Sequence, residues 1–72
     1  MSKRFSGVKM TYQGIVLRSA RFKDTQDNID ICIEALCLLL GLDEDLIFGR
    51  EPLRPSLFEE NGGRIEYYRE TG

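Results

Sequence analysis

Residues 24–42 read DTQDNIDICIEALCLLLGL, and this pattern predicts the helix around which the rest of the chain is arranged. Asp24 and Thr25 are both suitable N-caps, because a short side-chain oxygen can accept a hydrogen bond from the free amides of the first turn. Gly41 is a suitable C-terminal residue, because glycine readily adopts the left-handed conformation that ends many helices. No proline interrupts the stretch, so we predict one helix over residues 25–41.

The predicted helix has two apolar stripes. The first has the three- and four-residue spacing of a face that packs against a sheet, and it contains Ile29, Cys32, Ile33, Leu36, Leu39 and Leu40. The second lies on another face and contains Ile31, Ala35, Leu38 and Leu42. Residues 35–40 include no polar side chain, and a helix that is apolar all round must be covered on all sides.

The second stripe is the candidate interaction surface. A chain of 72 residues buries only about 60% of the surface of its unfolded form, and one small sheet covers one face of a helix. Either the segment after the helix folds over the second stripe, or the stripe contacts another protein chain. We favour a contact with another chain, because large exposed apolar patches mark interaction sites. The predicted interface comprises Ile31, Ala35, Leu38, Leu42 and the nearby Phe48.

Strands are predicted on both sides of the helix. Residues 7–12 and 15–22 alternate in polarity and are rich in β-branched and aromatic side chains. Gln13 and Gly14 between them predict a hairpin turn, with one long bulged strand as the alternative. Residues 64–70 read RIEYYRE, which predicts a last strand with Ile65 and Tyr67 on one face and Tyr67 in the core.

The connection from the helix to the last strand predicts two short helical turns. Asp43 is a suitable cap for a turn over residues 44–48, which Gly49 ends. Ser56 is the predicted cap of a second turn that runs to residue 60, and residues 61–63, which read NGG, predict a reverse turn. The side chains expected to cover the helix from this connection are Leu53, Leu57 and Phe58.

Together these elements predict a small α+β domain. Its order is ββα…β, with a short antiparallel sheet packed against one dominant amphipathic helix over about residues 25–41. We expect residues 1–72 to form a single domain, with residues 1–6 as a flexible basic arm and residues 71–72 as a frayed end.

Charge is divided unevenly along the chain. Residues 1–23 carry six basic side chains and no acidic one, whereas residues 24–72 carry a net charge of −8. Pairing of the last strand with the first two offers a structural explanation, because it would place Glu66 beside basic side chains. The alternative function is that of a dimeric nucleic-acid-binding protein whose basic strands contact phosphates and whose aromatic side chains stack on bases. Its candidate residues are Lys9, Arg18, Arg21 and Lys23.

The sequence offers little support for catalysis. It contains no histidine, which is the commonest general base at neutral pH and the commonest metal ligand. Residues 43–45, which read DED, lack the spacing of a calcium loop, and the chain has no glycine-rich phosphate loop before a helix. We therefore expect no enzymatic activity, no cofactor and no bound metal.

The remaining features predict an intracellular protein. Cys32 and Cys37 are five residues apart on one helix and point to different sides, so they are interpreted as buried small apolar residues in a reducing compartment. No signal peptide is recognisable, and the longest uncharged run is far shorter than the ~20 residues that cross a bilayer. We expect a cytoplasmic, non-catalytic protein that acts by protein–protein contact, as a homodimer or as an accessory or inhibitory factor for a larger partner.

Overall fold

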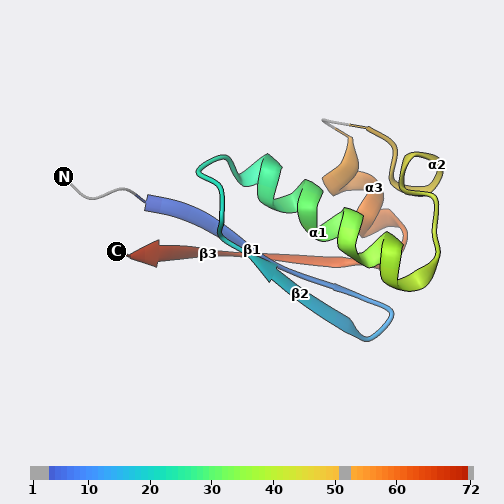
Figure 1. The fold of residues 1–72 in the computed structure, drawn as a ribbon, viewed down its shortest axis with the longest axis horizontal. Coiled ribbons are helices and arrows are strands. Elements are labelled where there is room, and N and C mark those ends of the chain that lie inside the picture. Colours follow the sequence, from blue (N-terminus) through green and yellow to red (C-terminus); the bar gives the residue numbers. More distant parts are fainter. Residues whose placement is uncertain (1–3, 51–52, 72) are drawn as a thin grey trace.

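The computed structural model describes residues 4–50 and 53–71. Within these ranges the order is β1 (Arg4–Tyr12), β2 (Ile15–Ser19), α1 (Thr25–Leu40), α2 (Glu44–Phe48), α3 (Arg54–Glu60) and β3 (Arg64–Thr71) (Figure 1). The strands form one antiparallel sheet in the order β2-β1-β3, and α1 packs against it. The predicted α+β fold with ββα…β order is confirmed.

Helix α1 begins and ends where its local chemistry predicts. The Asp24 carboxylate accepts a hydrogen bond from the backbone N–H of Gln26 at 2.9 Å, which satisfies one of the free amides of the first turn. Gly41 has a φ of 71°, in the left-handed region, and its N–H donates to the carbonyl of Cys37. The last helical residue is Leu40, so the predicted range is correct to within one residue.

The first two strands form the predicted hairpin. Gln13 and Gly14 have φ values of 49° and 81°, and a two-residue loop with positive φ at both positions matches the twist of its flanking strands. Strand β2 ends at Ser19 rather than at residue 22. The reason is that the buried side chain of Asn28 binds the backbone of Phe22, which directs this segment toward α1.

The sheet extends further toward the chain ends than the sequence predicts. Residues 4–6 were predicted to belong to a flexible arm, but β1 begins at Arg4 because β3 is long enough to pair with it, with Thr71 opposite Arg4. Strand β3 likewise includes Thr71, which was predicted to be frayed. Residues 1–3 and 72, the other parts of the predicted arm and frayed end, lie outside the described residues.

The core lies between the sheet and the helices. Three aromatic rings, those of Tyr12, Phe48 and Phe58, meet with centroids 5.5 Å apart in each pair and join β1 to α2 and α3. The other buried apolar residues come from the sheet and from α1. They are Val8, Met10, Ile29, Cys32, Ile33, Leu36, Cys37 and Ile65.

Two predicted details of the C-terminal part are wrong. Tyr67 faces the same side of the sheet as Ile65 but is 58% exposed, because it lies on an edge strand that the helices do not cover there. Ser56 does not cap α3, which begins at Arg54 and has Pro55 in its first turn. A proline is accommodated there because the amides of a first helical turn have no partner within the helix.

Candidate protein-interaction surface

One side of α1 carries apolar side chains that the described part of the chain leaves exposed. Ile31, Ala35, Leu38 and Leu39 lie within about 100° of one another around the helix axis, and we call these four residues the apolar flank. Leu38 is 84% exposed and Leu39 is 64% exposed, whereas Ile31 and Ala35 are half-buried. Helix α2 contacts α1, and Arg54 of α3 pairs with Asp30 of α1. Asp30 lies about 100° around the helix axis from Ile31, on the side away from Ala35 and Leu39, so these helices do not cover this surface.

The structure separates the residues of the predicted interface. Ile31, Ala35 and Leu38 lie in the apolar flank at the surface. Leu42 packs against the core instead. Phe48 is completely buried between Tyr12 and Phe58, so its inclusion in an interface is wrong: its ring is needed to close the core under α2.

Sequence reasoning missed three exposed leucines, of which Leu53 was predicted to cover the helix but is 60% exposed. Leu39 has the spacing of the buried stripe and was assigned to it, but it lies on the side of α1 that α2 and α3 leave open. Leu46 of α2 is 82% exposed, while its neighbour Phe48 turns into the core. The run of apolar residues from 46 to 48 carries no signal that separates the outward from the inward side chains.

A groove of about 190 Å³ lies beside the apolar flank, between α1 and β2. Ile31 and Ala35 form its wall on the helix, and Leu17 forms its wall on the strand. Arg18 and Arg21 also line it. The groove therefore combines residues of the predicted interface with two of the residues predicted for nucleic-acid binding.

The segment beside this groove is held by Asn28, a polar residue with no exposed surface in the first turn of α1. Its side-chain oxygen accepts hydrogen bonds from the hydroxyl of Ser19 at 2.8 Å and from the backbone N–H of Phe22 at 3.1 Å. Its side-chain nitrogen donates to the carbonyl of Phe22 at 3.0 Å. Asn28 therefore fixes the path of the chain from β2 to α1, including Arg21 at the groove.

Replacement of Asn28 by alanine is expected to lower the free energy of unfolding by about 2–3 kcal/mol, because it leaves the buried Ser19 hydroxyl and the Phe22 backbone without these hydrogen bonds. Urea denaturation measures the loss, and hydrogen exchange at the Phe22 amide reports the local opening. Thr25→Ala, at a neighbouring position on the first turn, is the control and should cost less than about 1 kcal/mol. Equal costs for the two variants would contradict this role of Asn28.

The candidate nucleic-acid residues are divided between two places. Lys9 and Arg18 are neighbours across β1 and β2, on the sheet face opposite α1, and Glu66 lies opposite Lys9 on β3 as the charge pattern predicts. Together with Tyr68 they line a hollow of about 420 Å³. Arg21 and Lys23 lie outside it, in the exposed segment before α1, where Arg21 lies over the ring of Phe22 at 5.5 Å.

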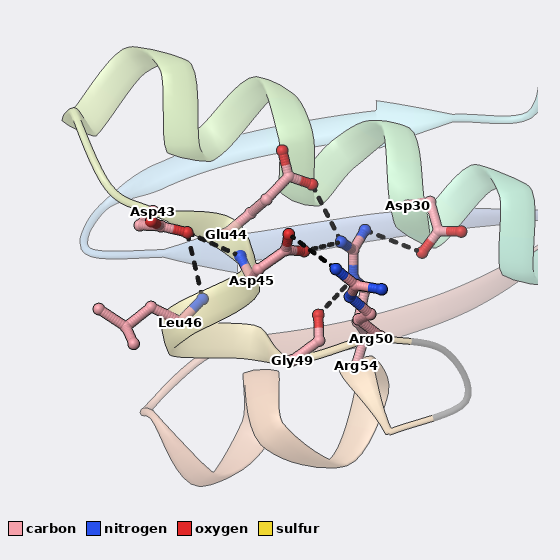
Figure 2. A network of polar contacts seen from close by, with 8 residues as sticks. All are labelled: Asp30, Asp43, Glu44, Asp45, Leu46, Gly49, Arg50 and Arg54. Atoms are coloured by element: carbon pink, nitrogen blue, oxygen red, sulfur yellow. Dashed lines mark hydrogen bonds and ion pairs between the residues drawn. The ribbon is translucent and has the colours of Figure 1, made fainter.

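The side chain of Arg54 connects three helices in a second polar region (Figure 2). Only 8% of the residue is exposed, and its guanidinium contacts Asp30 of α1 at 3.4 Å and Glu44 and Asp45 of α2 at 3.1 and 3.2 Å. Its Nε also donates to the carbonyl of Gly49 at 2.8 Å. The guanidinium is paired with groups of the fold itself, so we interpret the cluster as structural. This cluster could not be predicted from the sequence, because Asp30 lies 24 residues from Arg54 along the chain.

The acidic triplet has a structural role that the sequence predicts in part. The Asp43 carboxylate accepts hydrogen bonds from the backbone N–H groups of Asp45 and Leu46 at 3.1 and 3.2 Å, so it caps α2 as predicted (Figure 2). Glu44 and Asp45, in the first turn of α2, form ion pairs with Arg54. Among the described residues, no group of three or more potential ligands is arranged to hold a metal ion.

Both cysteines are buried and free, as expected for small apolar residues of the core. Burial raises the pKa of the Cys32 thiol, and burial followed by the nearby Glu44 raises the pKa of the Cys37 thiol. The folded protein therefore favours the neutral thiols, whereas unfolding lets them ionise near the ordinary value of 9.0.

The free energy of unfolding is expected to be independent of the thiols below pH 9 and to fall above it, because only the unfolded chain then gains from ionisation. Each thiol contributes at most about 1.4 kcal/mol per pH unit in this window. Denaturation in urea at pH 7.5 and pH 10 measures the difference. The Cys32→Ala/Cys37→Ala double variant should lose less stability over the same interval; an equal loss would show that other groups cause it.

Comparison of the chain with protein-family models, with curated proteins and with solved structures gives no match. Within the described ranges, no helix has both the length and the apolar character needed to cross a membrane.

Proposed function

We propose that this protein is non-catalytic and acts by protein–protein contact, as a homodimer or as an accessory or inhibitory factor for a larger partner. The observation that supports this proposal is the apolar flank, where Leu38 and Leu39 expose most of their side chains on adjacent positions of the main helix. Covering a leucine side chain contributes about 1.5–3 kcal/mol, and exposed apolar patches of this kind favour association. The free thiols agree with a reducing compartment such as the cytoplasm.

Sedimentation of the purified chain tests self-association. A homodimer is expected to sediment at about twice the chain mass of 8.3 kDa, and Leu38→Lys should shift it toward the monomer, because a lysine cannot be covered there without losing its hydration. Glu60→Lys, at an exposed position of α3, also introduces a lysine, away from the apolar flank, and should leave the mass unchanged.

If the chain sediments as a monomer, the same variants test whether it binds a larger partner. The wild-type protein and Glu60→Lys should retain one partner from an extract of the native host, and Leu38→Lys should lose it. The proposed function is overturned if the chain is a monomer and Leu38→Lys abolishes the binding of no partner.

A second candidate function is nucleic-acid binding, favoured by the adjacent Lys9 and Arg18 with Tyr68 on one sheet face. The ring of Tyr68 lies against Gly7, where an added Cβ would be 2.5 Å from it, so the aromatic side chain lies close to the basic pair. Single-stranded DNA or RNA should then bind with an affinity that falls steeply with salt, and Lys9→Glu should weaken it. No binding at low salt would remove this candidate.

A further inference from the structure

We propose that the outer edge of β2 binds an extended acidic segment of a partner protein as an additional strand. This inference rests on the proposed function and specifies how the partner would be held and what chemistry it would have. In the described sheet β2 has one neighbouring strand, β1, because the strand order is β2-β1-β3. Its other edge therefore presents backbone groups that a further strand can pair with.

The hairpin register determines which backbone groups point outward. Tyr12 and Ile15 flank the two-residue turn, and a turn of this type joins its flanking residues by a hydrogen bond. Bonded and non-bonded pairs alternate along an antiparallel ladder. The N–H and C=O groups of Val16 and Arg18 therefore point away from β1, toward the place that an added strand would occupy.

The groove between β2 and α1 supplies contacts for side chains of the added strand. Strand β2 and α1 lie next to each other and run in opposite directions (Figure 1), and Leu17, Ile31 and Ala35 line the groove between them. Side chains of a strand alternate between the two faces of a sheet, so every second side chain of the added strand would enter this groove. Peptide-binding domains use the same combination of a free strand edge and adjoining pockets.

The charge at this edge favours an acidic segment. Arg18 lines both the groove and the hollow on the opposite sheet face, so this residue lies at the edge between them. Arg21 lines the groove as well, and residues 1–23 include no acid. A charged side chain on an edge strand disfavours pairing with neutral or basic strands and favours an acidic one. A second copy of β2 is disfavoured, because both copies would bring Arg18 and Arg21 to one interface.

Peptide titration monitored by NMR tests the inference with the full chain. The probe is a blocked seven-residue peptide in which valines alternate with aspartates. Amide shifts are expected to concentrate at Val16, Arg18 and Ala35. A matched peptide with lysines in place of the aspartates should bind about tenfold more weakly, and so should an aspartate peptide methylated at alternate backbone nitrogens, which cannot donate to the edge.

Two variants of β2 distinguish the contribution of backbone hydrogen bonds to peptide affinity from the contribution of charge. Val16→Pro removes an outward N–H but no hydrogen bond to β1, so it should weaken binding about tenfold, whereas Val16→Ala keeps the N–H and should change the affinity less than about threefold. Arg18→Glu should reverse the preference from the aspartate to the lysine peptide. Arg18→Glu leaves every backbone group in place, so it remains informative if Val16→Pro is found unfolded.

The outcomes distinguish this inference from the proposed function. Absence of shifts at β2 with the aspartate peptide at ~1 mM, or equal binding of the lysine peptide, would overturn the inference and leave any association that depends on Leu38 intact. Peptide binding at β2 without such an association would support the inference while overturning the proposed role of the apolar flank. If Val16→Pro dissociates a homodimer, the strand that pairs with β2 is a second copy of this chain and not an acidic segment of a partner. If single-stranded DNA displaces the peptide, the ligand of this edge is a nucleic acid and not an acidic segment of a protein.

Discussion

Replacement of Phe48 by alanine is expected to lower the free energy of unfolding by about 3–5 kcal/mol. The side chain is completely buried and its ring contacts those of Tyr12 and Phe58, so alanine removes apolar contacts on several sides and leaves a cavity. A chain of 72 residues has a total stability of about 4–11 kcal/mol. The variant is therefore expected to be partly unfolded at room temperature or close to it.

Leu38→Ala is the matched control, because it also truncates a large apolar residue. Leu38 is 84% exposed, so its truncation should change the free energy of unfolding by less than about 0.5 kcal/mol. Circular dichroism during urea denaturation measures both variants at a protein concentration where the wild type is monomeric. Similar costs for Phe48→Ala and Leu38→Ala would contradict the division between core and surface described above.

Arg54→Met is expected to cost about 2–4 kcal/mol, because it removes the cation shared by three carboxylates and leaves the Gly49 carbonyl without its charged donor. Asp30, whose side chain is 18% exposed, is affected most, since water can solvate it only in part. The side chain of Asp45 is 54% exposed, and its contact contributes less. Thermal or urea denaturation measures the loss.

Arg50→Met is the control for Arg54→Met. The Arg50 side chain is 83% exposed and lies 3.8 Å from Asp45, so its removal should change the free energy of unfolding by less than about 0.5 kcal/mol. Addition of Asp30→Asn to Arg54→Met should restore part of the stability, because the least hydrated unpaired charge is then gone. If Arg54→Met costs no more than Arg50→Met, the buried guanidinium does not hold the helices together.

Elements that depend on neighbouring residues could be predicted from the sequence. Asp24 and Gly41 determine the ends of α1 through interactions within a few residues, and Gln13 and Gly14 determine the hairpin in the same way. The same holds for the cap of α2 at Asp43. Each of these features depends only on interactions between residues that are close in the sequence.

Features that depend on distant contacts could not be predicted. Arginine is usually a surface residue. The burial of Arg54 follows from the carboxylates that α1 and α2 place around it. Asn28 is likewise an ordinary residue for the first turn of a helix, until β2 brings Ser19 next to it. Leu39 has the spacing of the buried stripe, but which side of α1 is covered depends on where α2 and α3 pack.

The position of β1 in the centre of the sheet also predicts an order of folding. Its pairing with β2 closes a two-residue loop, whereas its pairing with β3 joins Arg4 to Thr71 across nearly the whole chain. Closing the long loop between β1 and β3 costs about 3 kcal/mol more in chain entropy than closing the hairpin. We therefore expect the hairpin to form first and the pairing of β3 with β1 to limit the rate of folding.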